Sequence, residues 1–431
     1  MLQVEQFTLR HHTSSVKALA VYQKNSCVKK CSRLYTADEH GNICEWDLPK
    51  RKLIRSWSVC DSKALQICII GIGILKSDLE SVLLYVHSKD HCLRFYDVTV
   101  SQPQKQSMYL PKPQLLWEMP VNTLNFSNVV VIPCSTQKTK KGSFQVWCCN
   151  TEDTEGIDVY EINPITKNLK RIVKNKKFGE NVKRGIVMCI CATKDFEYIS
   201  VGYENGSCVL VERDSVYTNS NKHIDVPFDE NSHFEQPILS MSCSKTSLYI
   251  GQAKSSSLYE YRLKTGVCET INIGKSAGSQ HFARRELSVT GICADLYETH
   301  NLIGFTTWET NTYYLFNVEH KKIIKTLEKS KSNVVPVSLD PTGNIETTGS
   351  NDLSEFEKSN NVSIESCLMM LGQKNNSTDS EKSNSQNEVL TTQRSRAIGA
   401  NPLAMKRINY MLQKDWLFLG FADGSVTVSN L

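Results

Sequence analysis

The chain has 431 residues, of which 40% are hydrophobic and 22% are charged, and its formal net charge is +5. This composition supports a large buried core, while the small excess of positive charge is a weak basis for binding nucleic acid. The first residues lack the basic, apolar and small-residue progression of a signal peptide, and the longest apolar run, residues 64–75, is too short for a spanning helix. We therefore expect neither a secretion signal nor a membrane segment.

A repeated hairpin pattern runs along the chain. The segment "RLYTADEHGNICEWDL" (residues 33–48) combines a small-residue strand, a Gly-Asn turn and a strand that ends in Trp46-Asp47, which is typical of a WD repeat. Weaker versions occur at residues 83–98, 198–212, 248–263, 302–318 and 417–431. Each pairs two short apolar strands through a polar turn, as in a propeller blade.

A further apolar run precedes most of these hairpins and supplies the innermost strand of a four-stranded unit. These runs lie at residues 16–21, 65–75, 187–191, 238–243, 289–294 and 405–411. One more unit lies between residues 115 and 162, where "LLWEMPVNTLNF" joins an outer strand to the next inner strand and "SFQVWCCN" pairs with "GIDVYEI". The sequence therefore predicts an all-β fold, a seven-bladed WD-repeat β-propeller.

The two ends of the chain complement each other. The last hairpin leaves no residues for an outer strand, and "EQFTLRHH" near the start reads as an outer strand without a blade. We expect the N-terminal strand to complete the last blade and close the ring, which removes exposed sheet edges.

Composition also predicts the domain boundaries. Residues 1–327 form the closing strand and blades 1–6, residues 328–396 form a disordered insertion rich in Ser, Asn and charge, and residues 397–431 form the last blade. Within the insertion, residues 362–372 are either a short amphipathic docking helix or an unstructured apolar stretch.

One blade carries most of a structural bracket that WD repeats share. In such repeats a His before the inner strand, a Ser or Thr in the second strand, an Asp in the turn and the Trp are joined by hydrogen bonds. His12, Thr36 and Trp46 occupy three of these positions, and His40 replaces the Asp. We expect an incomplete bracket here.

The sequence predicts no catalytic, cofactor or metal site, and hence a protein that is not an enzyme. No phosphate-binding glycine loop, nucleophile elbow or zinc-protease helix motif occurs. Cys27, Cys31, His40 and Cys44 have a spacing that superficially resembles a zinc knuckle, but tetrahedral ligation would pull the hairpin apart. The 16 cysteines are better explained as reduced thiols, many of them packed inside strands.

A basic cluster lies between residues 170 and 184. It lacks the interleaved aromatic side chains on which bases stack, so a solvated outer strand and loop explain it better than direct nucleic-acid binding. Its members are Lys170, Arg171, Lys174, Lys176, Lys177, Lys183 and Arg184.

As a whole, the chain resembles the ASTRA-associated protein 1 family of yeasts. The opening "FTLRHHTSSVKAL", the segment at residues 33–48, the degenerate middle blades, the insertion and the closing "LFLGFADGSVTVSNL" carry the resemblance. It implies a non-enzymatic scaffold subunit of the ASTRA complex, linked to chromatin remodelling and to the assembly or stability of phosphatidylinositol 3-kinase-related kinases. The implied partners are co-chaperones of those kinases, RuvB-like AAA+ ATPases and a kinase-like transcription cofactor. The implied location is the nucleus, with the cytoplasm as a second compartment.

Two other functions stay open at this level. One is a G-protein β-like adaptor. The other is a reader of a modified peptide or nucleic acid through the central channel. In an assembly subunit, residues near the blade turns, such as His12, Glu39, Asn205 and Asp423, would lie beside a protein partner.

Overall fold

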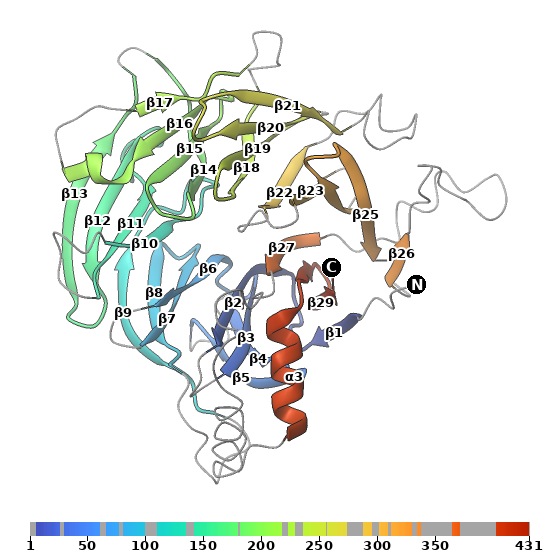
Figure 1. Ribbon diagram of the computed structural model, residues 1–431. Coiled ribbons are helices and arrows are strands. Elements are labelled where there is room, and N and C mark those ends of the chain that lie inside the picture. The colour runs from blue at the N-terminus through green and yellow to red at the C-terminus, as the bar shows by residue number, and fades with distance from the viewer. Residues whose placement is uncertain are drawn as a thin grey trace, which may run out of the picture.

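The computed structural model shows seven antiparallel sheets arranged around a ring (Figure 1). The structure describes residues 6–25, 30–60, 66–76, 81–99, 110–134, 142–179, 182–217, 223–228, 236–255, 257–273, 288–294, 301–308, 312–329, 334–337, 364–370 and 402–430. Each sheet is one blade, and we number the blades 1 to 7 from the first complete sheet. This architecture is the predicted seven-bladed propeller.

The first four blades follow one another along the chain. Blade 1 contains β2 (Val16–Asn25), β3 (Lys30–Asp38), β4 (Asn42–Asp47) and β5 (Lys52–Ser58). Blade 2 contains β6 (Ile69–Lys76), β7 (Val82–Ser88), β8 (Cys92–Asp97) and β9 (Gln114–Pro120). Blade 3 contains β10 (Val130–Pro133), β11 (Phe144–Cys149), β12 (Ile157–Asn163) and β13 (Asn168–Lys176). Blade 4 contains β14 (Val187–Ala192), β15 (Tyr198–Tyr203), β16 (Cys208–Glu212), the 3-10 helix η1 (Arg213–Tyr217) and β17 (His223–Asp225).

The last three blades complete the ring. Blade 5 contains β18 (Ile238–Cys243), β19 (Ser247–Gln252), β20 (Ser257–Arg262) and β21 (Cys268–Asn272). Blade 6 contains β22 (Val289–Ala294), β23 (Leu302–Thr307), β24 (Tyr313–Asn317), β25 (Lys322–Lys329) and β26 (Val334–Val337). Blade 7 contains β27 (Ile364–Met370), β28 (Trp416–Phe421), β29 (Ser425–Asn430) and β1 (Gln6–Arg10), and the helix α3 (Pro402–Gln413) connects β27 to β28.

The ring is closed by the N-terminal strand, as the sequence predicts. β1 pairs antiparallel with β29, from Gln6 opposite Ser429 to Arg10 opposite Ser425. The innermost strands also contact one another all the way round, from β2 through β6, β10, β14, β18 and β22 to β27, which returns to β2. Both ends of the chain therefore hold the same blade together.

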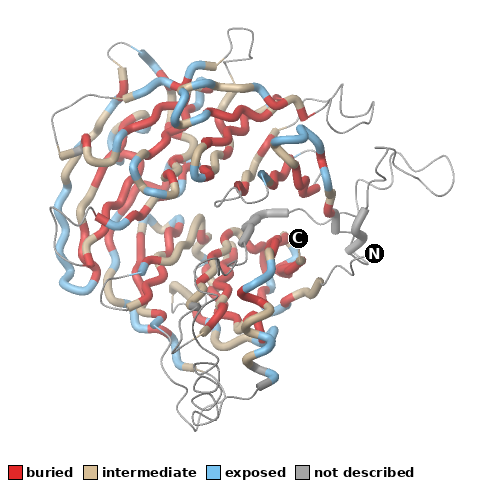
Figure 2. Tube along the Cα trace, viewed as in Figure 1, coloured by how far each residue is buried: buried red, intermediate tan, exposed pale blue. Residues whose placement is uncertain are grey.

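The core lies between neighbouring blades (Figure 2). Middle strands such as β11 and β28 are buried along their whole length because a blade packs against each of their faces. This burial explains why these strands read as nearly continuous apolar runs rather than as alternating patterns. Outer strands such as β13 are far more exposed.

The last blade corrects two predictions. Residues 405–411, predicted as its inner strand, belong to α3, which packs Tyr410 and Met411 into the apolar cluster of blades 1 and 7. The inner strand is instead β27, which lies where the sequence suggests a docking helix or an unstructured stretch, and it pairs with β28 from Ile364 to Met370. No helix among the described residues has both the length and the apolar character needed to cross a bilayer.

The prediction that residues 328–396 form a disordered insertion is wrong in part. β25 extends to Lys329, β26 adds a fifth strand to blade 6, and β27 is a strand of blade 7. The Ser- and Asn-rich run at residues 373–396 lies outside the described residues, so its predicted disorder stays a prediction.

Candidate functional site

His12, Thr36 and Trp46 meet inside blade 1. The Trp46 indole Nε1 donates a hydrogen bond to the Thr36 hydroxyl at 3.0 Å, and this hydroxyl lies 2.7 Å from Nε2 of His12. Nδ1 of His12 lies 2.9 Å from Oδ2 of Asp38. A single chain of hydrogen bonds therefore joins the connection before β2 to the second and third strands.

Asp38 completes this bracket, so the prediction that His40 replaces the acidic residue is wrong. The Asp38 carboxylate also accepts hydrogen bonds from the backbone N–H groups of His40 and Asn42 and from the Asn42 amide. Burial raises the pKa of Asp38, but the hydrogen bonds from His12 and Asn42 outweigh it and hold the pKa below its ordinary value. His12 is buried with both ring nitrogens hydrogen-bonded inside the blade, which makes it a structural residue rather than a partner contact.

Other blades use different polar groups for similar purposes. In blade 2 the Arg94 guanidinium pairs with Asp90 and donates to Ser88. In blade 3 the buried carboxylate of Asp158 accepts from Asn150 at 2.9 Å and pairs with Arg171. This substitution of one polar network for another explains why the repeats are hard to recognise in sequence.

The end of the propeller that carries His12 and the turns between second and third strands is here called the upper face. The connection from β9 to β10, residues 121–129, lies on it, because the Val121 N–H donates to the carbonyl of His91 in the β7–β8 turn. Asn122 donates to the Asn150 carbonyl, and Asn125 donates to the carbonyls of Thr154 and Val187. These bonds fix the connection to blades 2, 3 and 4.

Two apolar side chains project from this connection. Leu124 is 72% exposed and Phe126 is 73% exposed, whereas Asn122, Thr123, Asn125 and Ser127 around them are buried. Ordinary folding buries the apolar side chains and exposes the polar ones, so this inverted pattern is unusual. We call Leu124 and Phe126 the apolar pair.

His87 lies beneath the same connection and is fully buried. Its Nδ1 lies 3.4 Å from Oδ1 of Asn128. Desolvation by burial lowers the pKa of His87 to about 4, against the smaller effect of its hydrogen bond to Asn128. His87 is therefore neutral near pH 7.

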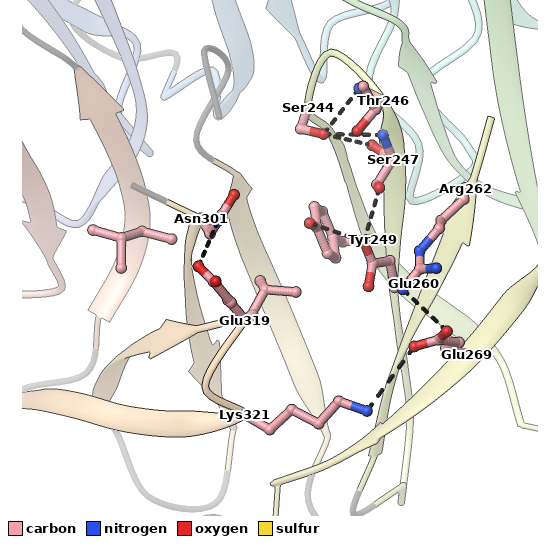
Figure 3. Close-up of a pocket in the computed structure, with 12 residues that line it drawn as sticks. Ser244, Thr246, Ser247, Tyr249, Glu260, Arg262, Glu269, Asn301, Glu319 and Lys321 are labelled. Atoms are coloured by element: carbon pink, nitrogen blue, oxygen red, sulfur yellow. Dashed lines mark hydrogen bonds and ion pairs between the residues drawn. The ribbon is translucent and has the colours of Figure 1, made fainter. Parts of the chain in front are cut away.

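A cavity of about 500 Å³ opens at the opposite end, which we call the lower face, between blades 5 and 6 (Figure 3). Its walls come from the β18–β19 and β20–β21 turns with their adjoining strands, and from the corresponding turns of blade 6. Above it the two blades pack tightly through Leu258, Ile303 and Phe316. The charged side chains that line the cavity therefore lie below this apolar packing.

Glu260 is the central polar group of this cavity. Its side chain stands on β20 and accepts hydrogen bonds from the hydroxyls of Ser247, at 2.8 Å, and Tyr249, at 3.4 Å. On the same blade, Arg262 pairs with Glu269 at 3.0 Å. Lys321 reaches Glu269 from blade 6 at 4.0 Å. The sequence analysis missed this site, because the partners of Glu260 lie on a neighbouring strand and the opposite wall of the cavity belongs to another blade.

The basic cluster of residues 170–184 lies largely on the exposed strand β13 and the connection that follows it. Its members include three that form ion pairs. Arg171 pairs with Asp158, Lys177 pairs with Asp153 at 2.5 Å, and Arg184 pairs with Asp225 at 2.7 Å. This arrangement matches a solvated outer strand and loop except at Arg184, which is buried and donates to the Phe178 carbonyl.

The cysteines that the structure describes as free thiols include the seven predicted to lie in strands, and all seven do so: Cys44, Cys149, Cys189, Cys191, Cys208, Cys243 and Cys293. Burial raises the pKa of Cys149 to about 12, which disfavours the thiolate that metals bind. Among the described residues, no group of three or more His, Cys, Asp or Glu is placed to hold a metal ion, and Cys27 lies outside them.

Comparison with known proteins assigns the family. The family model of ASTRA-associated protein 1 matches residues 5–429. The chain belongs to the ASTRA-associated protein 1 family. A relative of that name in Zygosaccharomyces rouxii is 27% identical and covers 100% of this chain and 99% of its own. The Kluyveromyces lactis relative is 23% identical, with 99% and 98% covered, and the Lachancea thermotolerans relative is 32% identical over 54% of this chain and 56% of its own.

A solved structure supports the fold. The crystal structure of Chaetomium thermophilum Raptor is similar to this chain with a TM-score of 0.56 and 9% identity. The match covers 98% of this chain but 28% of Raptor. At this identity the likeness concerns architecture alone.

Proposed function

We propose that the protein is a non-enzymatic scaffold subunit of the ASTRA complex. The observation that carries this proposal is the family match, which spans nearly the whole chain, blades and connections alike. The relatives that match end to end carry the name ASTRA-associated protein 1. We extend that association to this chain, and with it a nuclear location, a cytoplasmic pool and roles in chromatin remodelling and kinase assembly.

The geometry supports a scaffold. A propeller closed by β1 is rigid and has two separate faces, each able to hold a different protein. On the upper face the apolar pair is held out by a connection that hydrogen bonds of Asn122 and Asn125 fix to the neighbouring blades. Because the connection is already ordered, it loses little conformational entropy when a partner buries the pair.

The proposed partners are co-chaperones of large kinases, RuvB-like AAA+ ATPases and a kinase-like transcription cofactor. The test is affinity purification of the tagged full-length protein from its native cells at moderate salt, followed by mass spectrometry. We expect these proteins to be retained in stoichiometric amounts. Recovery of histones or RNA without them would contradict the scaffold proposal and favour a reader of peptides or nucleic acid.

Substitution of the apolar pair tests whether it contacts a protein partner. We expect Leu124→Ser/Phe126→Ser to reduce recovery of at least one partner by tenfold or more, because a few large anchor side chains carry most of the binding energy of an interface. Ile165→Ser is the matched control, since Ile165 is 45% exposed in the β12–β13 turn of the lower face. Equal losses for both variants would show that the effect is not specific to the apolar pair.

A further inference from the structure

We propose that the cavity between blades 5 and 6 binds the cationic side chain of a lysine or arginine presented by a protein partner. The inference rests on the proposed function in one respect, namely that a partner supplies the cation. It adds a second contact, on the lower face, to the apolar pair of the upper face.

The first observation is an uncompensated carboxylate. Glu260 is only 7% exposed, and no Lys, Arg or His of the described residues lies within ion-pair distance of it. Two hydroxyl groups, from Ser247 and Tyr249, hold one carboxylate oxygen in place. A buried charge without a counter-ion is costly, so its retention at the wall of a cavity fits a role in binding a cation.

The second observation is how the cavity distributes its own charges. Arg262 and Lys321 both pair with Glu269, which leaves neither of them for Glu260. Glu319 on the opposite wall accepts a hydrogen bond from the Asn301 amide at 3.0 Å. The lining therefore holds three carboxylates and two cations, a net charge of −1.

The third observation is shape. Glu260 and Tyr249 stand on one wall of the cavity, with Asn301 and Glu319 across from them (Figure 3). Leu302 and Val318 also line the space. These apolar groups and the Tyr249 ring would contact the aliphatic stem of a lysine or arginine while its head reaches Glu260. A volume of about 500 Å³ leaves ample room for such a side chain.

Preference of the cavity for a cationic side chain is tested by titrating the full-length protein with argininamide, lysinamide and citrullinamide. Saturation-transfer NMR measures the binding of each compound. Citrulline has nearly the shape of arginine, but its side chain is uncharged. We expect the two cations to bind, citrullinamide to bind at least tenfold more weakly, and Glu260→Gln to reduce cation binding at least tenfold. Glu197→Gln, which makes the same change at an exposed lower-face turn outside the cavity, should leave binding unchanged. Equal binding of citrullinamide, or full binding by Glu260→Gln, would overturn the proposal.

A second substitution tests the same cavity in case Glu260→Gln fails to fold. Glu319 is exposed, so Glu319→Arg should fold normally while placing a guanidinium at the cavity mouth as an internal competitor. We expect it to abolish cation binding, whereas Glu319→Gln should retain it. Retained binding by Glu319→Arg would contradict the assigned site.

The source of the cation is tested by affinity purification with Glu260→Gln and Glu319→Arg. We expect both variants to lose one partner by tenfold or more while the partner held by the apolar pair is kept. Full recovery of every partner by both variants would contradict the proposal that a partner supplies the cation. Failure of the wild-type protein to retain any partner would instead contradict the proposed scaffold function.

Discussion

Blade 1 and the interface between blades 5 and 6 use buried polar groups in opposite ways. In blade 1 the Asp38 carboxylate accepts from four donors and His12 is bonded at both nitrogens. Between blades 5 and 6, Glu260 accepts hydrogen bonds from two hydroxyls, and the two cations that line the cavity, Arg262 and Lys321, pair with Glu269 instead. A network whose members are satisfied stabilises the blade, whereas a carboxylate left without a counter-ion is suited to binding.

The largest expected effect on stability comes from removing the strand that closes the ring. Deletion of residues 1–10 should lower the free energy of unfolding by roughly 3–5 kcal/mol, because Leu9 is buried and Phe7 packs on Trp416 at 6.3 Å between ring centroids. Urea unfolding measures this loss. Deletion of residues 373–392 is the comparison, and we expect a change below about 0.6 kcal/mol, since loop length costs little. A similar loss for both deletions would contradict ring closure as a source of stability.

Asp38→Asn tests the satisfied network directly. The amide would present a donor where four donors already converge, so we expect a loss of roughly 2–4 kcal/mol in the free energy of unfolding. Asp423→Asn makes the same change at the corresponding turn of blade 7, where the side chain is exposed, and should cost less than about 0.5 kcal/mol. Equal effects at the two turns would show that the bracket contributes nothing special.

His87 predicts a pH dependence of stability. Its pKa falls from 6.5 in the unfolded chain to about 4 in the fold, so the unfolded state binds more protons between these values. Its contribution is complete above pH 6.5 and is lost as the pH falls toward 4, by roughly 3 kcal/mol at most. Urea unfolding at several pH values measures the slope. His87→Gln should flatten it, and an unchanged slope would rule out His87 as its origin.

The smallest expected effect on stability belongs to the apolar pair. Leu124→Ser/Phe126→Ser should change the free energy of unfolding by less than about 0.5 kcal/mol, since both side chains are mainly solvated. Thermal unfolding checks this, with Leu9→Ser as a buried counterpart that should cost several times more. A large loss for the exposed pair would mean that it supports the fold rather than a partner.

Much of the fold follows from sequence because local patterns define the hairpins. Short polar turns with Gly41, Gly206 or Gly424 at positive φ mark the junctions between second and third strands. The predicted inner strands of blades 1, 2, 4, 5 and 6 all fall on observed strands. The pairing of β1 with the last blade can also be predicted, because the last hairpin lacks an outer strand and the N-terminal strand has no blade of its own.

The last blade was harder to predict, because its inner strand is defined by pairing with a strand that is distant in sequence. β27 pairs with β28 across a long connection, so nothing adjacent in sequence marks it as a strand. The helix α3 has apolar residues Ile408, Met411 and Leu412 at helical spacing, which we interpreted as a strand. In both cases tertiary packing decides between helix and strand.

The sites were less accessible to sequence than the fold. Asp38 lies two residues before the position assigned to the acidic member of the bracket, and only its contact with His12 in the folded blade identifies it. The apolar pair lies in "VNTLNF", which reads as strand until the hydrogen bonds of Asn122 and Asn125 are known. The cavity depends on how blades 5 and 6 meet, which no local pattern encodes.

The most direct test of the contrast between the two regions is to measure stability and partner recovery on the same variant, Glu260→Gln. We expect the free energy of unfolding to stay within about 1 kcal/mol of the wild-type value, because the hydroxyls of Ser247 and Tyr249 can still bond to the amide. We also expect one partner to be lost from the purified complex. A variant that unfolds easily while retaining all partners when folded would contradict this assignment and place Glu260 with Asp38 as a structural group.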